Sequence, residues 1–381
     1  MNDTLNLQQF VGRLQNDVQR RIAVVSSKGT SSSDNSNYVH YKKMDKLLPI
    51  YSSESEEYIP FIVNCTNNMR VNEIKDFVTN LENLENCKIN DVYLFMDESH
   101  KYNKNNIKSS IDECKELNIV KGCFEISATP YSLIGDFQSL KAYNEYDENL
   151  NERYHSVDEN EYITVDFKPK NRNRKNANNK FYHSTRQFLE KIQDEHNVLN
   201  DGNRIFIPGN RQRISHYDIA NYVLEKNRNY VVIVLNGESD IIEFYDNNDI
   251  YRKFDMKTTI KGNVEINEKI NKYLDVYSLY DRGFIITGKI NVGMGATLSN
   301  LKYGNFTHAI IFDDLVTTKK PDEEKRDVLY QLVGRTSGNF KNWEKYVKTK
   351  IYTTKEIKAF ALGVDKAAEE IYNNLDKPIN K

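Results

Sequence analysis

Cysteine is scarce in this chain, with four residues among 381. Cys65, Cys87, Cys114 and Cys123 include no C-x₂-C pair, which argues against a zinc site, and their spacing does not indicate a disulfide framework. We therefore expect reduced thiols in an intracellular protein.

Long apolar runs are absent as well. No stretch reaches the roughly 20 residues of a membrane-spanning helix, and Met1 to Thr4 do not have the charged-then-apolar pattern that opens a signal peptide. The sequence also contains no internal repeat of solenoid length. These absences predict a soluble, intracellular protein without a membrane partner, located in the cytoplasm or, if the protein is viral, in the host cell.

A strong net charge is missing too, because Lys and Arg total 53, Asp and Glu total 55, and the net charge is −2. No global basic field therefore indicates a nucleic-acid partner, and any such site must be a local patch. The dense basic run from Lys168 to Lys175 favours a solvated linker, with contact to a phosphate backbone as the alternative. Heavy use of Asn, Lys, Ile and Tyr is typical of an AT-rich genome, such as that of a phage, a large virus or an AT-rich bacterium.

Two apolar runs end at small or acidic residues. Val92 to Met96 leads into Asp97-Glu98-Ser99-His100, and Phe124 to Ile126 leads into Ser127-Ala128-Thr129, with a predicted helix at 107–117 between them. Buried parallel strands deliver polar groups to the carboxyl edge of a sheet in this way, and nucleotides bind at that edge. An acidic pair there can hold Mg²⁺ through water and orient an attacking water, although a single acidic dipeptide is more often a solvated loop end.

The remaining pattern alternates strands and helices in both halves, and the length suits two domains. The first half predicts a helix at 5–21, a strand at 22–25, a small-residue loop at 26–33, a strand at 58–65 and a helix at 71–84. The second half predicts strands at 204–208, 230–235, 283–287 and 308–312, with helices at 184–199, 216–227, 263–277 and 327–334.

These motifs, in this order, resemble those of superfamily 2 helicases and translocases of the DEAD/DEAH-like type. Asp97 to His100 resembles motif II, Ser127 to Thr129 motif III, Thr287 to Thr297 motif V, and Gln331 to Gly338 motif VI. The resemblance implies an α/β fold with two tandem RecA-like domains, each a mostly parallel sheet flanked by helices. The corresponding boundaries are 1–140 for the first domain, 141–200 for a linker or insertion, 201–365 for the second domain and 366–381 for a tail.

The resemblance also implies ATP and Mg²⁺ as cofactors, bound between the two domains. Asp97 and Ser33 would hold Mg²⁺, Glu98 would orient water, and Gln331 with Arg335 would sense the γ-phosphate, an arginine effect worth roughly 10³ to 10⁵ in rate. By the same resemblance, the nucleotide would be bound by Gly29, Thr30, Ser33 and Gly295, and its state coupled to domain closure by Ser127, Ala128, Thr129 and His100.

A nucleic-acid partner follows from the resemblance, because family members grip one strand with backbone amides and hydroxyls. The expected partner is DNA or RNA, as a single strand bound without sequence preference and with strong salt dependence. Taken alone, a residue of this kind is more often a plain loop residue than a ligand contact. The candidates are Thr66, Asn67, Asn68, Arg211, Arg213, Thr287 and Lys289.

Some positions depart from the family pattern. A P-loop of the form G-x-x-x-x-G-K-[ST] wraps phosphates with backbone amides and neutralises charge with lysine. Here Ser31 and Ser32 replace the second glycine and the lysine, and the segment is equally well interpreted as a Ser-rich flexible loop. Gly338 holds the position of the final motif VI arginine, and Met294 and Thr297 replace the commoner Arg and Asp of motif V.

Three hypotheses therefore stay open. The first is an ATP-dependent motor that translocates on nucleic acid or unwinds it. The second is a helicase-fold protein with impaired catalysis, which serves as a nucleic-acid-binding or protein-interaction module. The third is a motor whose P-loop lies elsewhere, for instance on a separate polypeptide.

Overall fold

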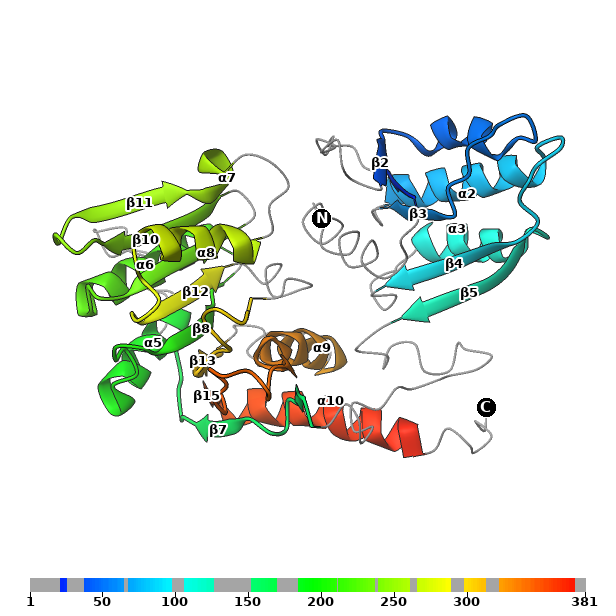
Figure 1. The fold of residues 1–381 in the computed structure, drawn as a ribbon. Helices are drawn as coiled ribbons and strands as arrows, with labels where there is room; N and C mark the ends of the chain where they lie inside the picture. The colour runs from blue at the N-terminus through cyan, green and yellow to red at the C-terminus, as the bar shows by residue number, and fades with distance from the viewer. Residues whose placement is uncertain are drawn as a thin grey trace, which may run out of the picture. The chain divides into compact units, whose positions relative to one another are not determined.

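The computed structural model describes residues 21–25, 38–64, 68–97, 106–126, 152–169, 184–210, 212–236, 239–260, 266–288, 298–312 and 322–373. The chain divides into two compact units, Met1–Gln138 and Ser139–Lys381, called unit 1 and unit 2 below. Figure 1 draws the elements of both. Among the described helices, none is both long and apolar enough to cross a membrane.

Unit 1 contains two groups of parallel strands. One is a sheet of order β2-β1-β3, and the other is the pair β4-β5. The strands are β1 (Ile22–Val25), β2 (Tyr38–Tyr41), β3 (Phe61–Asn64), β4 (Val92–Asp97) and β5 (Val120–Ile126). The helices are η1 (Met44–Tyr51), α2 (Asn68–Glu82) and α3 (Asn106–Lys115).

Strand β1 lies at the centre of its sheet, and all four of its residues are apolar and buried. A strand that is covered on both faces has this continuous apolar pattern. Leu47 of η1 and Phe77 and Leu81 of α2 belong to the same hydrophobic cluster as Ala23 and Val25. The strand predicted at 22–25 is therefore confirmed. The one predicted at 58–65 is shorter, since Pro60 has no N–H for a sheet hydrogen bond.

Unit 2 is built on an eight-stranded sheet of order β11-β10-β9-β12-β8-β13-β15-β7. All neighbours from β9 to β7 are parallel, whereas β10 and β11 add an antiparallel edge. Its strands are β7 (Glu161–Thr164), β8 (Arg204–Pro208), β9 (Val231–Leu235), β10 (Asp240–Tyr245), β11 (Tyr251–Asp255), β12 (Phe284–Gly288), β13 (His308–Ile310) and β15 (Lys350–Thr353). A separate two-stranded ribbon joins β6 (Tyr154–His155) to β14 (Gly338–Asn339).

The helices of unit 2 bury amphipathic faces against this sheet. In α8, for example, Ile266, Ile270, Tyr273 and Leu274 recur at helical spacing and are buried. Helix α6 packs on β9 and β12, and α9 lies beside α10 (Figure 1). The helices are α5 (Ser184–His196), α6 (Arg213–Lys226), α7 (Met256–Thr259), α8 (Ile266–Val276), α9 (Asp322–Val333), η6 (Gly334–Thr336) and α10 (Lys355–Asn373).

The predicted fold class, α/β with mostly parallel sheets flanked by helices, is confirmed. Two segments differ from the sequence-based expectation. The range 141–200 was expected to be a linker or insertion, but β7 within it pairs in parallel with β15 as a member of the large sheet. The range 366–381 was expected to be a tail, but α10 continues as far as Asn373. In the basic run, Lys168 is exposed, and residues 170–175 lie outside the described residues.

Candidate functional site

The acidic strand end in unit 1 lies beside the end of its neighbouring strand. Asp97 is the last residue of β4 and pairs with Ile126, the last residue of β5, and the two strands are parallel. The segments that follow them therefore start from one edge of the sheet. Five predicted site residues belong to these segments and lie outside the described residues: Glu98, His100, Ser127, Ala128 and Thr129.

The Ser-rich loop starts at the end of the buried strand β1. Val25, the last residue of β1, pairs with Asn64, the last residue of β3, and this pair is also parallel. Asn68 begins α2 directly after this edge. The loop candidates Gly29, Thr30 and Ser33, the departures at Ser31 and Ser32, and the candidate contacts Thr66 and Asn67 all lie outside the described residues.

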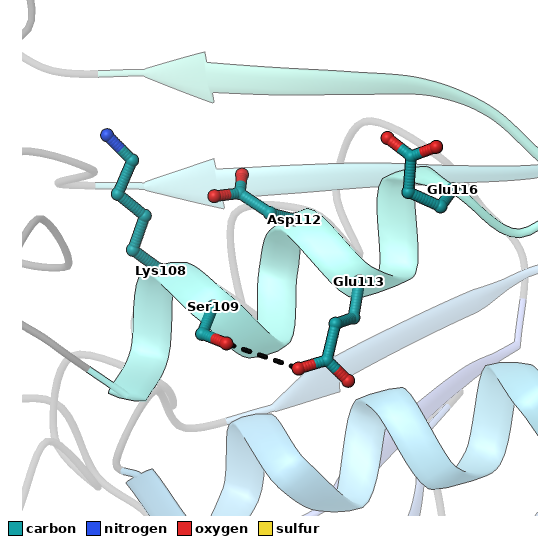
Figure 2. Close-up of a pocket in the computed structure, with 5 residues that line it drawn as sticks. All are labelled: Lys108, Ser109, Asp112, Glu113 and Glu116. Carbon is teal, nitrogen blue, oxygen red and sulfur yellow. Dashed lines mark hydrogen bonds between the residues drawn. The ribbon is translucent and has the colours of Figure 1, made fainter.

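A hollow on unit 1 lies along helix α3 and is lined by Lys108, Ser109, Asp112, Glu113 and Glu116. In Figure 2, Lys108, Asp112 and Glu116 project upwards from the helix, and Ser109 and Glu113 project downwards. Ser109 Oγ donates to Glu113 Oε1 over 3.1 Å, and Lys75 of α2 forms an ion pair with Glu113. The Lys75 ammonium holds the pKa of the Glu113 carboxyl below its usual range. This ion pair connects α2 to α3. Among the described residues, no group of three or more His, Cys, Asp or Glu side chains could hold a metal ion.

In unit 2 the ends of β8 and β13 are tied together through the start of α5. The Thr185 hydroxyl lies 2.6 Å from Asn210 Oδ1 and 3.3 Å from the carbonyl oxygen of Phe312. Gly209 N donates to the carbonyl of Gly288 over 2.9 Å, which continues the pairing of β8 with β12. The carboxyl edge of this sheet is therefore held by hydrogen bonds between segments distant in sequence.

The turn from β8 into α6 is fixed by side chains at the start of the helix. Asn210 N donates to Ser215 Oγ over 3.0 Å, and Ser215 Oγ donates to the carbonyl of Gln212 over 2.7 Å. His216 Nε2 donates to the carbonyl of Asn210 over 3.0 Å. Arg213 is exposed and is the first residue of α6, the helix that follows the carboxyl end of β8. Arg211 lies outside the described residues.

Thr287, a candidate nucleic-acid contact, is the penultimate residue of β12 and is 0% exposed. Its hydroxyl has no hydrogen-bond partner among the described residues. An unpaired buried polar group costs about 1–3 kcal/mol. The hydroxyl therefore lies inside the sheet edge rather than on its surface. Lys289 and Gly295 lie outside the described residues, as do Met294 and Thr297.

Gln331 and Arg335 are brought together by one continuous helical segment. Gln331 lies in the last turn of α9, and Arg335 lies in η6, which continues from α9 without a break. Both are half-buried, while the neighbouring Leu332 and Val333 are buried in the core. Thr336 Oγ1 donates to the carbonyl of Val333 over 2.7 Å and closes the end of the helix. Residues four apart lie on one helical face, so their polar groups can act on a common ligand.

The glycine at the end of motif VI has a structural reason. Gly338 has a φ of +153°, and a Cβ at this position would lie 2.9 Å from Phe340 Cε1. Both the backbone conformation and the contact favour a residue without a side chain. An arginine at this position would therefore be strained by the local backbone, which the sequence alone did not reveal.

Sequence reasoning did not identify Thr185, Asn210, Ser215 and His216 as residues that hold the carboxyl edge. A signal was present, because Pro208-Gly209-Asn210 is a turn pattern that follows a strand, and Ser215 stands near the start of a helix. The contacts of Thr185 gave no such signal, because its hydroxyl meets Asn210 and the carbonyl of Phe312, which lie 25 and 127 residues away in the chain.

No protein-family model and no curated protein sequence matches the chain. Among solved structures, it is similar to a DEAD box protein from the hyperthermophile Methanococcus jannaschii, with a TM-score of 0.35 and 10% sequence identity. The similarity covers 95% of this chain and 76% of that one. At this TM-score and identity, it does not identify the family or the activity.

Proposed function

We propose that the chain is an ATPase of the superfamily 2 helicase type, which couples hydrolysis to movement along or unwinding of nucleic acid. The observation that carries the proposal is the parallel pairing of Asp97 with Ile126, which starts the motif II and motif III segments at one sheet edge. The helical segment with Gln331 and Arg335 in a second α/β unit is a further support.

In this proposal the chain's residues divide the work of phosphoanhydride hydrolysis. Asp97 and Ser33 would hold the Mg²⁺ of Mg-ATP, and Glu98 would accept a proton from the attacking water. Arg335, with Gln331, would stabilise the negative charge that develops on the γ-phosphate. ATP and water would thus yield ADP and phosphate, with positioning and electrostatics as the main contributions of the protein.

The partner in this proposal is a single strand of DNA or RNA, bound without sequence preference. Arg213 is exposed at the start of α6. The free backbone N–H groups at a helix N-terminus favour a phosphate group, and the guanidinium of Arg213 adds a positive charge at that end. The net charge of −2 is compatible with such a local contact. Binding should weaken steeply with salt.

A steady-state ATPase assay with and without single-stranded nucleic acid tests the motor. Glu98→Gln should lower the rate by about 10²-fold or more while leaving ATP binding intact, because it removes only the base. Glu116→Gln, which changes an exposed carboxylate just after α3, is the matched control and should hydrolyse ATP at the wild-type rate. Wild-type protein that neither hydrolyses nor binds ATP would exclude the motor.

The second candidate is an impaired helicase-fold module that binds nucleic acid or a protein without hydrolysing ATP. It is favoured by Ser31 and Ser32, which stand where a P-loop has its second glycine and lysine. Titration calorimetry with a non-hydrolysable ATP analogue separates the two candidates. Under the alignment given above, the double variant Ser31→Gly with Ser32→Lys should bind the analogue more tightly than the wild type.

A further inference from the structure

The segment that follows Arg335 is held by a short ribbon from the beginning of unit 2. Gly338 pairs with His155, and Asn339 pairs with Tyr154, in the antiparallel ribbon of β14 and β6. Lys341 N extends the ribbon by donating to the carbonyl of Arg153 over 3.0 Å. β14 begins two residues after η6, so this ribbon fixes the backbone on the carboxyl side of Arg335.

His155 stands at the centre of this contact and is 0% exposed. Its Nε2 lies 3.0 Å from Asn160 Oδ1, and its Nδ1 lies 3.0 Å from the Tyr346 hydroxyl. Asn160 Nδ2 donates to the carbonyl of Val157 over 2.9 Å, so Oδ1 is the atom that faces the ring. A carbonyl oxygen only accepts, and therefore Nε2 carries the hydrogen and Nδ1 accepts from Tyr346.

Rings and charges complete this group, which we call the His155 cluster: His155, Glu159, Asn160, Phe340, Lys341 and Tyr346. The His155 ring lies 5.7 Å from the Phe340 ring and 5.8 Å from the Tyr346 ring. Glu159 Oε2 is 3.6 Å from His155 Nδ1, while Glu159 Oε1 is paired with Lys341 Nζ at 2.6 Å. Burial lowers the pKa of His155, and the nearby charges of Lys341 and Lys348 act in the same direction. The hydrogen bond with Asn160 and the charge of Glu159 oppose this effect without cancelling it.

Arg335 thus lies between two fixed points. On its amino side, Leu329, Leu332 and Val333 of α9 are buried in the core of unit 2. On its carboxyl side, β14 is held by hydrogen bonds and ring contacts of the His155 cluster. Loss of the cluster would free one end of this short segment while leaving α9 in place.

We propose that His155 is a positioning residue that, through Tyr346 and the β6-β14 ribbon, fixes the backbone that presents Arg335 to its ligand. This inference rests on the proposed function, in which Arg335 acts on the γ-phosphate. His155 itself touches no reacting atom in this scheme. Its effect is therefore expected in the rate of hydrolysis rather than in ATP affinity.

The test compares His155→Gln, His155→Ala and Tyr346→Phe with the wild-type full chain. Tyr346→Phe keeps the ring and removes only the hydroxyl that donates to His155, so it is the mildest change. Tyr280→Phe is the matched control, because it removes a tyrosine hydroxyl that bonds to Asn271 elsewhere in unit 2. The readouts are kcat and KM for ATP in the presence of single-stranded nucleic acid, and amide hydrogen exchange of residues 334–341.

We expect faster exchange at 334–341 in His155→Ala and Tyr346→Phe, and a kcat lowered by up to about 10²-fold at nearly constant KM, since a displacement of about 1 Å can cost this much. His155→Gln retains an N–H donor for Asn160 and should recover part of the loss. Residues 231–235 of β9 should exchange as in the wild type in every variant.

Three results would overturn the inference, each in a distinguishable way. Faster exchange with an unchanged kcat would show that the cluster supports the fold but does not position Arg335. Unchanged exchange at 334–341 in both His155→Ala and Tyr346→Phe would show that the cluster does not hold this segment. A wild-type protein without hydrolysis would refute the proposed function itself, and with it the role given to Arg335.

Discussion

Gly209 lies directly against the imidazole ring of His216: a Cβ at position 209 would stand 2.1 Å from His216 Cδ2 and 2.8 Å from Nε2. The same Nε2 donates to the carbonyl of Asn210. The close approach of β8 to α6 therefore depends on the absence of a side chain at position 209, and the turn that carries Arg213 to the sheet edge depends on that approach.

Gly209→Ala should accordingly destabilise unit 2. Overpacking typically costs about 1–3 kcal/mol, because the ring or the backbone has to shift. Trp343 is the single tryptophan of the chain and lies in unit 2, so its fluorescence in a denaturant titration reports this unit. Gly363→Ala in α10 is the control. A Cβ added at position 363 would have no neighbouring atom within 4 Å, and alanine should stabilise the helix there by about 0.5–1 kcal/mol relative to glycine.

Gly338→Arg, which places an arginine where the resembling helicase motif usually has one, should lower the stability of the protein. The φ of +153° and the contact with Phe340 are unfavourable for any side chain, with a cost of about 1–3 kcal/mol. Gly338→Ala should lose a similar amount of stability, because the backbone and not the charge is responsible. Thermal unfolding of both variants checks this, and a Gly338→Arg protein as stable as wild type would contradict it.

His308 predicts a pH dependence of unit 2. Burial, together with Lys350 and Arg204, lowers the pKa of His308 from 6.5 to about 4. Below pH 6.5 the unfolded chain binds a proton that the folded unit resists, so stability falls as the pH is lowered from about 6.5 towards 4. His308→Gln should flatten part of this decline in Trp343-monitored denaturant titrations. The rest should persist, because the pKa of His155 is lowered as well. An identical pH profile in the variant would exclude His308 as a source.

The sequence predicted the strands of unit 2 best where they are buried on both faces. Val231–Leu235 is an unbroken apolar run, Phe284–Gly288 starts with three apolar residues, and every residue of both strands is buried. β7 escaped prediction because Glu161-Tyr162-Ile163-Thr164 is short, half polar and only partly buried at the edge of the sheet. Its pairing with β15 joins residues far apart in the chain, which no local pattern records.

In the candidate site, too, some features follow from local sequence patterns and others depend on contacts between distant segments. Asp97, Gln331 and Arg335 follow from local motifs and lie at a strand end and a helix end, where such residues were expected. The contacts of Gly338 and His155 could not be read from the sequence, because Gly338 gains its meaning from a backbone angle and from Phe340. His155 gains its partner Tyr346 only when β6 and β14 meet. Motifs thus predict which groups are present, and tertiary contacts decide how they are held.

Nucleic-acid binding, if it takes place at the carboxyl edge of unit 2, should depend on Arg213 in a specific way. Arg213→Gln should weaken binding of a fluorescent single strand equally for different sequences, and should reduce the slope of log K against log salt by about 0.7, the contribution of one phosphate contact. Arg228→Gln is the matched control. Arg228 is exposed, pairs with Asp249 at 3.0 Å and lies just before β9, at the amino end of the strands. It should leave the slope unchanged. Equal reductions in both variants would indicate general charge attraction, and would contradict a binding site at the carboxyl edge.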